Sequence, residues 1–443
     1  MMTRTTPNPT RRFSKRCRQV LGCIIGSMLL LAIQTAALTA ALACQEITLE
    51  EPKSPPSLAV ESSQLPTDDE TAAKKKKPGR KRASRKRTRK QSAKPQSTEP
   101  KYEFTIKHLI DHSTVKNQNN TETCWSFAMA SFIESELIRR DKGRHDLSEM
   151  FIVKNIYRSK IDNYVLRKGE TSFSQGALGH DFLNAAERYG LAPEEIFDGR
   201  DSIELEHDHD ELESVMRGFL DGVVKQSKLS LKWKPASDRI LDVYLGRTPK
   251  RFDYRGRSYT PLELRESLGF RSDDYVSITS FNHHRFYDDF VLEVPDNFSN
   301  GSFYNLPINQ LMSVIDKAIK NGFSIAWDGD VSERGFSSLK GIAVLPEDPN
   351  RPDVFARPAK EIRATQAMRQ AGLMTLGTTD DHLMHLVGIS HDTAGNKYYV
   401  LKNSWGETGE HKGFIHMSQA YARAKTISIV VHKEALPARL KRR

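Results

Sequence analysis

Cys124 is the residue of this chain whose surroundings point most directly to chemistry. The residues after it include apolar or small side chains at the spacing of one helix face, so we expect Cys124 to begin a helix; they are Phe127, Ala128, Ala130, Ser131, Ile133, Leu137 and Ile138. A thiol is a strong nucleophile only when ionised, and a helix N-terminus lowers its pKa. These neighbours favour a nucleophile over a small buried hydrophobe.

The residues before Cys124 could assist such a nucleophile. The side-chain amide of Gln118, six residues earlier, could donate to a developing oxyanion together with the backbone N–H of Cys124. The other polar residues of this stretch predict an exposed, turn-rich approach; they are Asn117, Asn119, Asn120, Thr121 and Thr123.

Further along the chain, the pattern favours strands. Residues 386–389 and 397–401 are expected to form two strands joined by a turn at 392–396. A nucleophile on a helix and a base on a strand would then meet across a domain interface. We therefore expect a mixed α+β fold, and we find no internal repeat.

Three segments resemble those of papain-like cysteine peptidases, and they occur in the order of that family. Gln118-x5-Cys124-Trp125-x-Phe127 resembles the nucleophile segment, residues 381–389 resemble the histidine strand, and residues 403–406 (Asn-Ser-Trp-Gly) resemble the asparagine segment. The resemblance implies an α+β papain-like two-lobe fold. A helical left lobe would carry the cysteine, a β-rich right lobe would carry the histidine and asparagine, and a cleft would separate them.

The resemblance also implies a role for each residue. His382, rather than His385, would take the thiol proton and later protonate the leaving amine. Asn403 would accept the far ring N–H of His382 and aim the ring, and Trp405 would shield that hydrogen bond from water. Gln118 would contribute electrostatic stabilisation.

Within the superfamily, the chain resembles the branch of bleomycin hydrolase and bacterial aminopeptidase C, over about residues 102–437. The 258 residues that separate Cys124 from His382 leave room for a large insertion, and the stretch from about 195 to 300 suggests no chemistry. Segments that carry this likeness are 147–150, 174–178, 189–195, 280–284 and 326–331. Gly176 is the implied site of backbone pairing to an extended substrate.

The C-terminus departs from that branch. There, a C-terminal arm enters the cleft and its carboxylate pairs with the substrate's α-amino group, which makes the enzyme an aminopeptidase. Here the resemblance ends at Pro437, and residues 438–443 are short and strongly basic. We expect an aminopeptidase; an endopeptidase with an open cleft is the alternative.

The N-terminal hundred residues predict export and a tether. Residues 1–44 combine basic residues with an apolar run from Val20 to Ala43 and an Ala-x-Ala site, which predicts a signal peptide or a membrane anchor. The protein is then expected in a bacterial periplasm or at the outer face of the inner membrane. Residues 45–100 are expected to be a disordered linker, and residues 101–443 the peptidase domain.

The net charge of +11 comes from the N-terminal part of the chain that precedes the peptidase domain. Residues 74–94 carry thirteen basic and no acidic side chains, whereas residues 95–443 carry 47 basic and 49 acidic ones. The basic segment is a solvated spacer or a contact for an anionic envelope or membrane, and nucleic acid is disfavoured. The expected partners are peptide substrates, with a homo-oligomer as a further candidate because relatives can form closed rings.

Other kinds of site are less favoured. His382 and His385 would point to opposite faces of a strand, and residues 207–210 (His-Asp-His-Asp) are expected to be solvated, so no metal or other cofactor is expected. His283 and His284 are expected to be structural or surface residues. Ser148 and Ser404 lack the motif of a serine nucleophile. A catalytically inactive, envelope-tethered peptide-binding protein is the second class of function.

Overall fold

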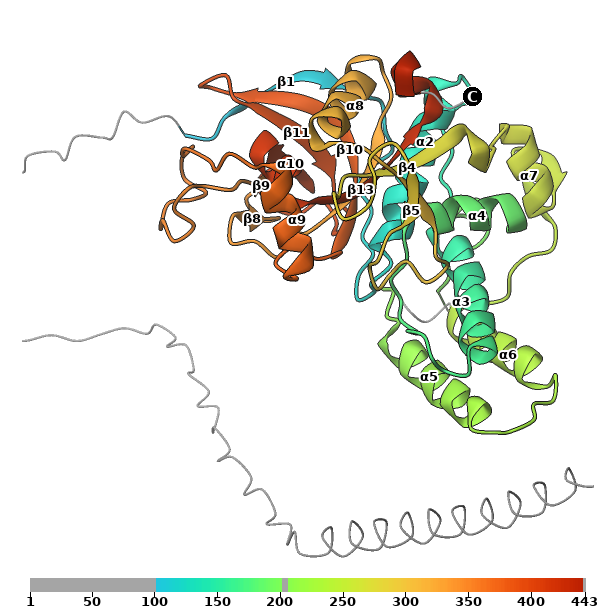
Figure 1. Cartoon of the computed structure of the whole chain (residues 1–443). Helices are drawn as coiled ribbons and strands as arrows, with labels where there is room; N and C mark the ends of the chain where they lie inside the picture. Colours follow the sequence, from blue (N-terminus) through green and yellow to red (C-terminus); the bar gives the residue numbers. More distant parts are fainter. Residues whose placement is uncertain (1–100, 201–205, 441–443) are drawn as a thin grey trace, which may run out of the picture. The chain divides into compact units, whose positions relative to one another are not determined.

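The computed structural model describes residues 101–200 and 206–440. The predicted signal or anchor, the linker with its basic segment 74–94, and residues 441–443 lie outside the described residues. The described part combines helices with one large sheet, which confirms the predicted α+β class (Figure 1). None of its helices has the length and apolar character needed to cross a bilayer.

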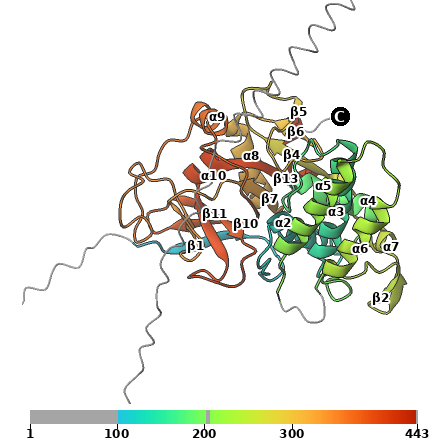
Figure 2. The same cartoon turned by 90° about the horizontal axis from the view of Figure 1, so that it is seen from below.

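Most of the helices gather on one side of the described structure, and the large sheet lies on the other (Figure 2). The helical side carries a hydrophobic core to which every one of its helices contributes buried side chains. These helices are α2 (Cys124–Arg139), α3 (Glu149–Leu166), α4 (Gly179–Tyr189), α5 (Asp210–Val224), α6 (Trp233–Leu245) and α7 (Pro261–Leu268).

The sheet has eleven strands in the order β5-β6-β4-β13-β7-β10-β11-β12-β9-β8, and β1 pairs with β10. Most neighbours are antiparallel; β4 with β6 and β12 with β9 are parallel. The strands are β1 (Phe104–Leu109), β4 (Tyr275–Thr279), β5 (Asp289–Val291), β6 (Ser302–Asn305), β7 (Ile325–Gly329), β8 (Phe336–Ser337), β9 (Ile342–Ala343), β10 (His382–Asp392), β11 (Lys397–Lys402), β12 (Phe414–Ser418) and β13 (Thr426–His432). A second core fills the sheet side, around α8 (Ile308–Lys320). Helix α10 (Gln419–Lys425) contributes Tyr421 and Ala422 to it, and α9 (Gln366–Met374) packs against α10.

Helix α2 lies between the two sides. It packs against β10 and β7 as well as against α3 and α4, and nearly all of its residues are buried. The buried surface of α2 therefore extends beyond the single apolar face that the sequence pattern suggested. Cys124 begins α2 as predicted, and the predicted strands are β10 and β11, so the junction brings the three candidate segments into one region.

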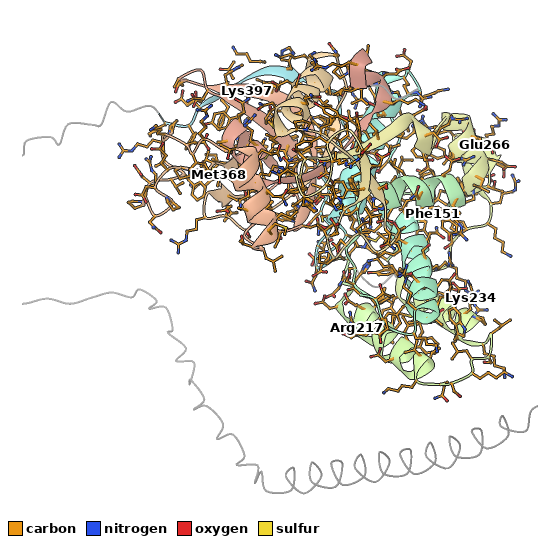
Figure 3. The ribbon with its side chains drawn as sticks, in the orientation of Figure 1. Phe151, Arg217, Lys234, Glu266, Met368 and Lys397 are labelled. Atoms are coloured by element: carbon orange, nitrogen blue, oxygen red, sulfur yellow. The ribbon has the colours of Figure 1, made fainter. Side chains whose placement is uncertain are left out.

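The insertion between residues 195 and 300 supplies α5, α6, α7 and a small hairpin of β2 (Phe252–Tyr254) and β3 (Arg257–Tyr259). Figure 3 shows Arg217 on α5 and Lys234 on α6 at the outer end of the helical side. Thr260 caps α7 by accepting from Glu263 N–H at 3.2 Å, while the Glu263 carboxylate accepts from Thr260 N–H at 2.7 Å.

Candidate active site

Cys124 is the first residue of α2 and is 8% exposed. The first N–H groups of a helix lack intrahelical partners, and the helix dipole favours negative charge at this end. The backbone N–H of Leu383 donates a hydrogen bond to the Cys124 thiol. Since Leu383 follows His382 directly, the thiol lies at the start of β10, beside the candidate base.

His382 is held from its other side by Asn403, which follows β11. His382 Nε2 lies 2.7 Å from Asn403 Oδ1, and both residues are buried. An amide oxygen only accepts, so Nε2 carries the hydrogen and Nδ1 has a free lone pair. The ring of Trp405 stacks on the His382 ring with centroids 4.6 Å apart. The structure thus brings Cys124, His382, Asn403 and Trp405 together.

Gln118 joins the loop before α2 to the Asn403 segment. Its Nε2 donates to the Thr121 carbonyl at 2.5 Å, and its Oε1 accepts from Ser404 Oγ at 2.6 Å. One N–H of the amide is therefore engaged within the loop, and Nε2 carries a second N–H. The approach is less exposed than predicted, since Gln118, Thr121 and Thr123 are all buried. The reason is that this loop packs beneath the 403–406 segment.

The electrostatics around the thiol oppose its ionisation. Burial raises the pKa of Cys124 to about 12, and the charges of Asp296, Asp380 and Asp328 raise it further. Burial also lowers the pKa of His382 to about 4, although the hydrogen bond to Asn403 acts in the opposite direction and raises it. Burial therefore favours the neutral thiol and the neutral imidazole, and transfer of the Cys124 proton to His382 forms the thiolate.

Gly176 lies beside the start of α2. Trp125 Nε1 donates to the carbonyl of Gln175 at 3.1 Å, which fixes this loop to the residue after the thiol. Lys160 Nζ donates to the Gly176 carbonyl and to the Ser174 carbonyl, the latter at 2.8 Å. The carbonyl that a substrate strand could use is thus already bound by a buried lysine.

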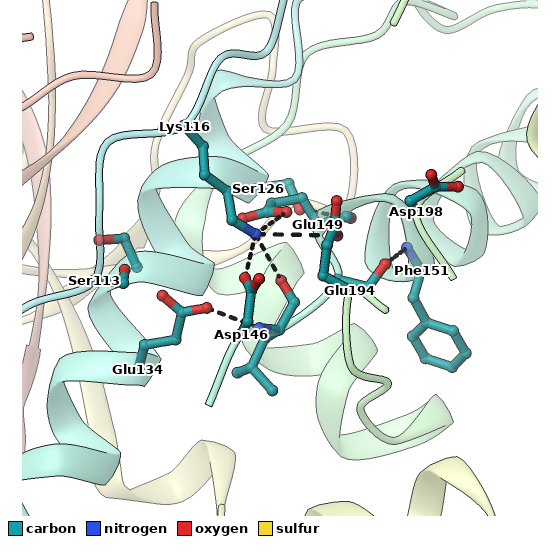
Figure 4. A network of polar contacts seen from close by, with 12 residues as sticks. Ser113, Lys116, Ser126, Glu134, Asp146, Glu149, Phe151, Glu194 and Asp198 are labelled. Carbon is teal, nitrogen blue, oxygen red and sulfur yellow. Dashed lines mark hydrogen bonds and ion pairs between the residues drawn. The ribbon is translucent and has the colours of Figure 1, made fainter. Parts of the chain in front are cut away.

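A partly buried network of charges lies beside α2 (Figure 4). Lys116 Nζ lies 2.6 Å from Asp146 Oδ1 and 2.9 Å from Glu149 Oε2. The Glu149 carbonyl accepts from Ser126 Oγ at 2.9 Å, and the Lys116 carbonyl accepts from Gly406 N–H at 3.0 Å. The network therefore connects the start of α3, the first turn of α2 and the loop that carries Asn403.

His385 does not share a site with His382. Its Nδ1 lies 2.7 Å from Ser131 Oγ, and burial holds its pKa well below the usual value. The prediction that the 207–210 stretch is solvated is wrong for its histidines. His207 is 7% exposed and His209 is 2% exposed because they pack near the rings of Phe127 and Tyr157.

The remaining alternatives also have structural explanations. His283 and His284 are exposed, with Nε2 atoms 3.1 and 2.7 Å from the carboxylate of Glu293. These three side chains could offer ligands to a metal ion, and the hydrogen bonds to Glu293 account for their proximity. Ser404 Oγ donates to Gln118 and Ser148 Oγ to a backbone carbonyl, so neither is hydrogen-bonded to an imidazole.

Comparisons with known proteins bear on the family and the fold of this chain. A family model described as the Peptidase C1-like family matches residues 182–443. The chain is 24% identical over 377 residues to aminopeptidase E of Lactobacillus helveticus, covering 74% of this chain and 82% of the relative. It is 22% identical over 393 residues to bleomycin hydrolase of Homo sapiens, covering 75% and 84%. Among solved structures, PepW from Lactobacillus rhamnosis HN001 matches with a TM-score of 0.62 and 21% identity, over 76% of this chain and 83% of that one.

Fold and comparisons together define a cysteine peptidase with a papain-like fold. Because the family match spans more than half of the chain, the protein belongs to the Peptidase C1-like family. The predicted resemblance to the branch of bleomycin hydrolase and the bacterial aminopeptidases is confirmed.

One group of residues near the thiol was not predicted from the sequence. Asp296, Asp328 and Asp380 all act on the Cys124 pKa, and they come from a loop, the end of β7 and the residues before β10. The carboxyls of Asp328 and Asp380 interact with each other, and burial raises the pKa of Asp328 to about 7. Asp328 belongs to a segment with family likeness, but nothing in the sequence places Asp296 near Cys124.

Proposed function

We propose that this protein hydrolyses peptide bonds with Cys124 as nucleophile, His382 as base and acid, and Asn403 as the residue that orients the imidazole. Two observations on consecutive residues carry the proposal: His382 Nε2 lies 2.7 Å from Asn403 Oδ1, and the backbone N–H of Leu383, the next residue, donates to the Cys124 thiol. A thiol, an imidazole with a free Nδ1 and a neutral amide acceptor are the groups that nucleophilic thiol catalysis requires.

The reaction follows from these groups. His382 Nδ1 takes the proton of Cys124 Sγ, and the thiolate attacks the carbonyl carbon of the substrate. The C–N bond breaks, and the amine leaves with the proton from His382. Water, deprotonated by the same nitrogen, then attacks the thioester, releases the acid and restores the thiol. The backbone N–H of Cys124 and the second N–H of Gln118 Nε2 are the proposed donors to the oxyanion.

The proposed substrates are peptides with a free amino terminus. The support is the set of relatives named as aminopeptidases, among them aminopeptidase E of Lactobacillus helveticus and aminopeptidase G of Lactobacillus delbrueckii. The endopeptidase alternative predicts cleavage of peptides with blocked amino termini. The alternative of a peptide-binding protein predicts no cleavage of either kind.

The test compares fluorogenic substrates on the full-length protein under reducing conditions, with free-amine aminoacyl amides beside their N-acetylated counterparts. We expect hydrolysis of the free-amine substrates and at least about a thousand-fold loss in Cys124→Ala, since the nucleophile is removed. Ser267→Ala, at an exposed position of α7, is the control and should keep most of the activity. Cleavage of the acetylated set alone would favour the endopeptidase, and no cleavage in wild type would favour the binding protein.

We also propose that the protein is exported, on the basis of the basic flank and apolar run in residues 1–44. Fusion of residues 1–100 to a reporter that is active only outside the cytoplasm tests this, with Arg11 and Arg12 changed to Glu as the control. Contact of residues 74–94 with an anionic surface, and self-assembly, stay predictions of the sequence.

A further inference from the structure

The carboxylate of Asp296 lies directly against the backbone of Gly176. A methyl group placed on Gly176 would come within 2.0 Å of Asp296 Oδ2 and 2.6 Å of Oδ1, so glycine is the residue that permits this approach. The contact lies beside the candidate nucleophile, because the Gln175 carbonyl is hydrogen-bonded to Trp125, the residue after Cys124. Asp296 thus covers the face of Gly176 at which the sequence analysis expected an extended substrate to pair.

The loop that carries Asp296, residues 292–301, is held firmly. Asn297 is 6% exposed, and its amide donates to the carbonyls of Leu292 at 2.8 Å and Gly301 at 3.0 Å. The Asn297 Oδ1 in turn accepts from the Gly301 N–H at 2.7 Å. Asn163 on α3 donates to the Phe298 carbonyl at 3.3 Å. Asp296 is therefore positioned by its loop.

The Asp296 carboxylate has no hydrogen-bond or ion-pair partner among the residues that the structure describes. The neighbouring cation, Lys160, is occupied by the carbonyls of Ser174 and Gly176 and lies 5.0 Å from the centre of the Phe298 ring. Burial raises the pKa of Asp296, which means that its charge is incompletely compensated. A half-buried carboxylate of this kind is suited to a cationic ligand.

The surroundings add to the negative charge. Asp328 is 1% exposed, and its Oδ1 has no partner among the described residues. Asp296, Asp328 and Asp380 interact with one another as well as with the thiol. Next to them is a cavity of about 600 Å³ that includes Asp380 in its lining and is otherwise mostly apolar; Val294, Pro295, Leu373, Met374 and Leu376 contribute to it. An apolar side chain fits this cavity, while the acidic edge is suited to an amine.

We propose that Asp296 binds the protonated α-amino group of the substrate and limits the acyl side of the scissile bond to one or two residues. This inference rests on the proposed peptidase function and deepens it. Asp296 covers the backbone of Gly176, so a longer chain could not continue past it. The amine of a short acyl portion would instead end on the carboxylate, with its side chain in the neighbouring cavity.

The proposal also links binding to the reactivity of the thiol. A bound amine compensates the Asp296 charge, which is the first of the charges that raise the pKa of Cys124. Removing that charge by mutation should therefore have two opposite effects. Recognition of the amine weakens, while the thiol ionises more readily. A variant that had only lost its fold would lose both properties together.

The experiment compares full-length wild type with Asp296→Asn, and with Asp288→Asn as a matched exposed control from the preceding segment. Substrates are neutral aminoacyl and dipeptidyl fluorogenic amides with free amines, their N-acetyl counterparts, and an N-acetyl-arginyl amide. For the best free-amine substrate we expect kcat/KM to fall about 10- to 100-fold in Asp296→Asn, the range for a charged hydrogen bond, and no change in Asp288→Asn. Acetylated substrates should be cleaved equally well or better by Asp296→Asn, and alkylation of Cys124 by iodoacetamide at fixed pH should be faster.

The results separate this inference from the function on which it rests. Wild type that cleaves free-amine substrates, together with an unaffected Asp296→Asn, overturns the inference and leaves the peptidase standing. Selective loss of the acetyl-arginyl substrate also overturns it, because Asp296 would then bind a basic side chain. Wild type that cleaves nothing overturns the peptidase function and the inference together.

Discussion

Replacing Lys116 by methionine should destabilise the protein strongly, and the cost should depend on pH. Lys116 Nζ lies among carboxylates at 2.6 Å (Asp146), 2.9 Å (Glu149) and 4.0 Å (Glu194), as Figure 4 shows. Glu149 is 2% exposed, so water cannot replace the lost cation. Removing one partner of a buried ion pair costs about 3–5 kcal/mol of unfolding free energy. Methionine keeps most of the lysine stem and limits any loss of packing.

The pH dependence follows from the carboxyl groups that remain. Burial raises the pKa of Glu149 and Lys116 lowers it, so the pKa rises further in the variant. The same holds for Glu134 and Glu194, whose pKa values are raised to about 7 and about 9. A carboxyl whose pKa is higher in the folded state does not lower stability below its unfolded pKa. Its destabilising effect grows as pH rises from the unfolded pKa to the folded pKa and then stays constant. The variant should thus differ least from wild type near pH 4 and most at pH 8.

Urea unfolding followed by circular dichroism at several pH values measures this difference. The matched control is Lys234→Met, since Lys234 pairs with Asp162 at 2.6 Å on the surface of α6 (Figure 3). An exposed pair is worth at most about 1 kcal/mol, and it should show little dependence on pH. Equal destabilisation of the two variants at pH 8, or a Lys116→Met cost that does not change with pH, would refute the reasoning.

Two further outcomes test the candidate site and its surroundings. Asn403→Ala should lower kcat about 10- to 100-fold with little change in KM, because it removes the amide oxygen that lies 2.7 Å from His382 Nε2 and orients the ring. Steady-state kinetics on a free-amine substrate measure both constants, and a change in KM alone would contradict the prediction. Burial lowers the pKa of His209 to about 4, so the stability that the neutral ring contributes above about pH 6.5 should be lost as pH falls toward 4. In His209→Gln, the unfolding free energy should fall less steeply over this pH range. An unchanged slope of unfolding free energy against pH would contradict this prediction.

Local sequence patterns were sufficient to predict the helix and the two strands around the candidate site. The helix after Cys124 and the strands β10 and β11 could be predicted, because periodicity and turn residues act over short stretches of chain. Their likeness to three family segments in order also predicted which residues would meet. The contact between His382 and Asn403 agrees with that expectation, since β10 and β11 are antiparallel neighbours.

Burial was harder to predict. His207 and His209 lie in a charged stretch, which favours solvent exposure, yet both rings are buried on the helical side. The exposed approach predicted before Cys124 is also partly buried, because the 403–406 segment covers Gln118. In both cases the covering residues are distant in sequence, so composition alone cannot report them.

The sequence by itself determined the class of this protein, since its thiol, imidazole and amide occur in recognisable short segments. The tertiary structure decided what surrounds them. Asp296 is an ordinary acidic residue of an insertion until the 292–301 loop brings it against Gly176 and near the Cys124 thiol. The physical reason is that electrostatic interactions depend on distance and burial in the folded chain, and neither can be read from the order of the residues.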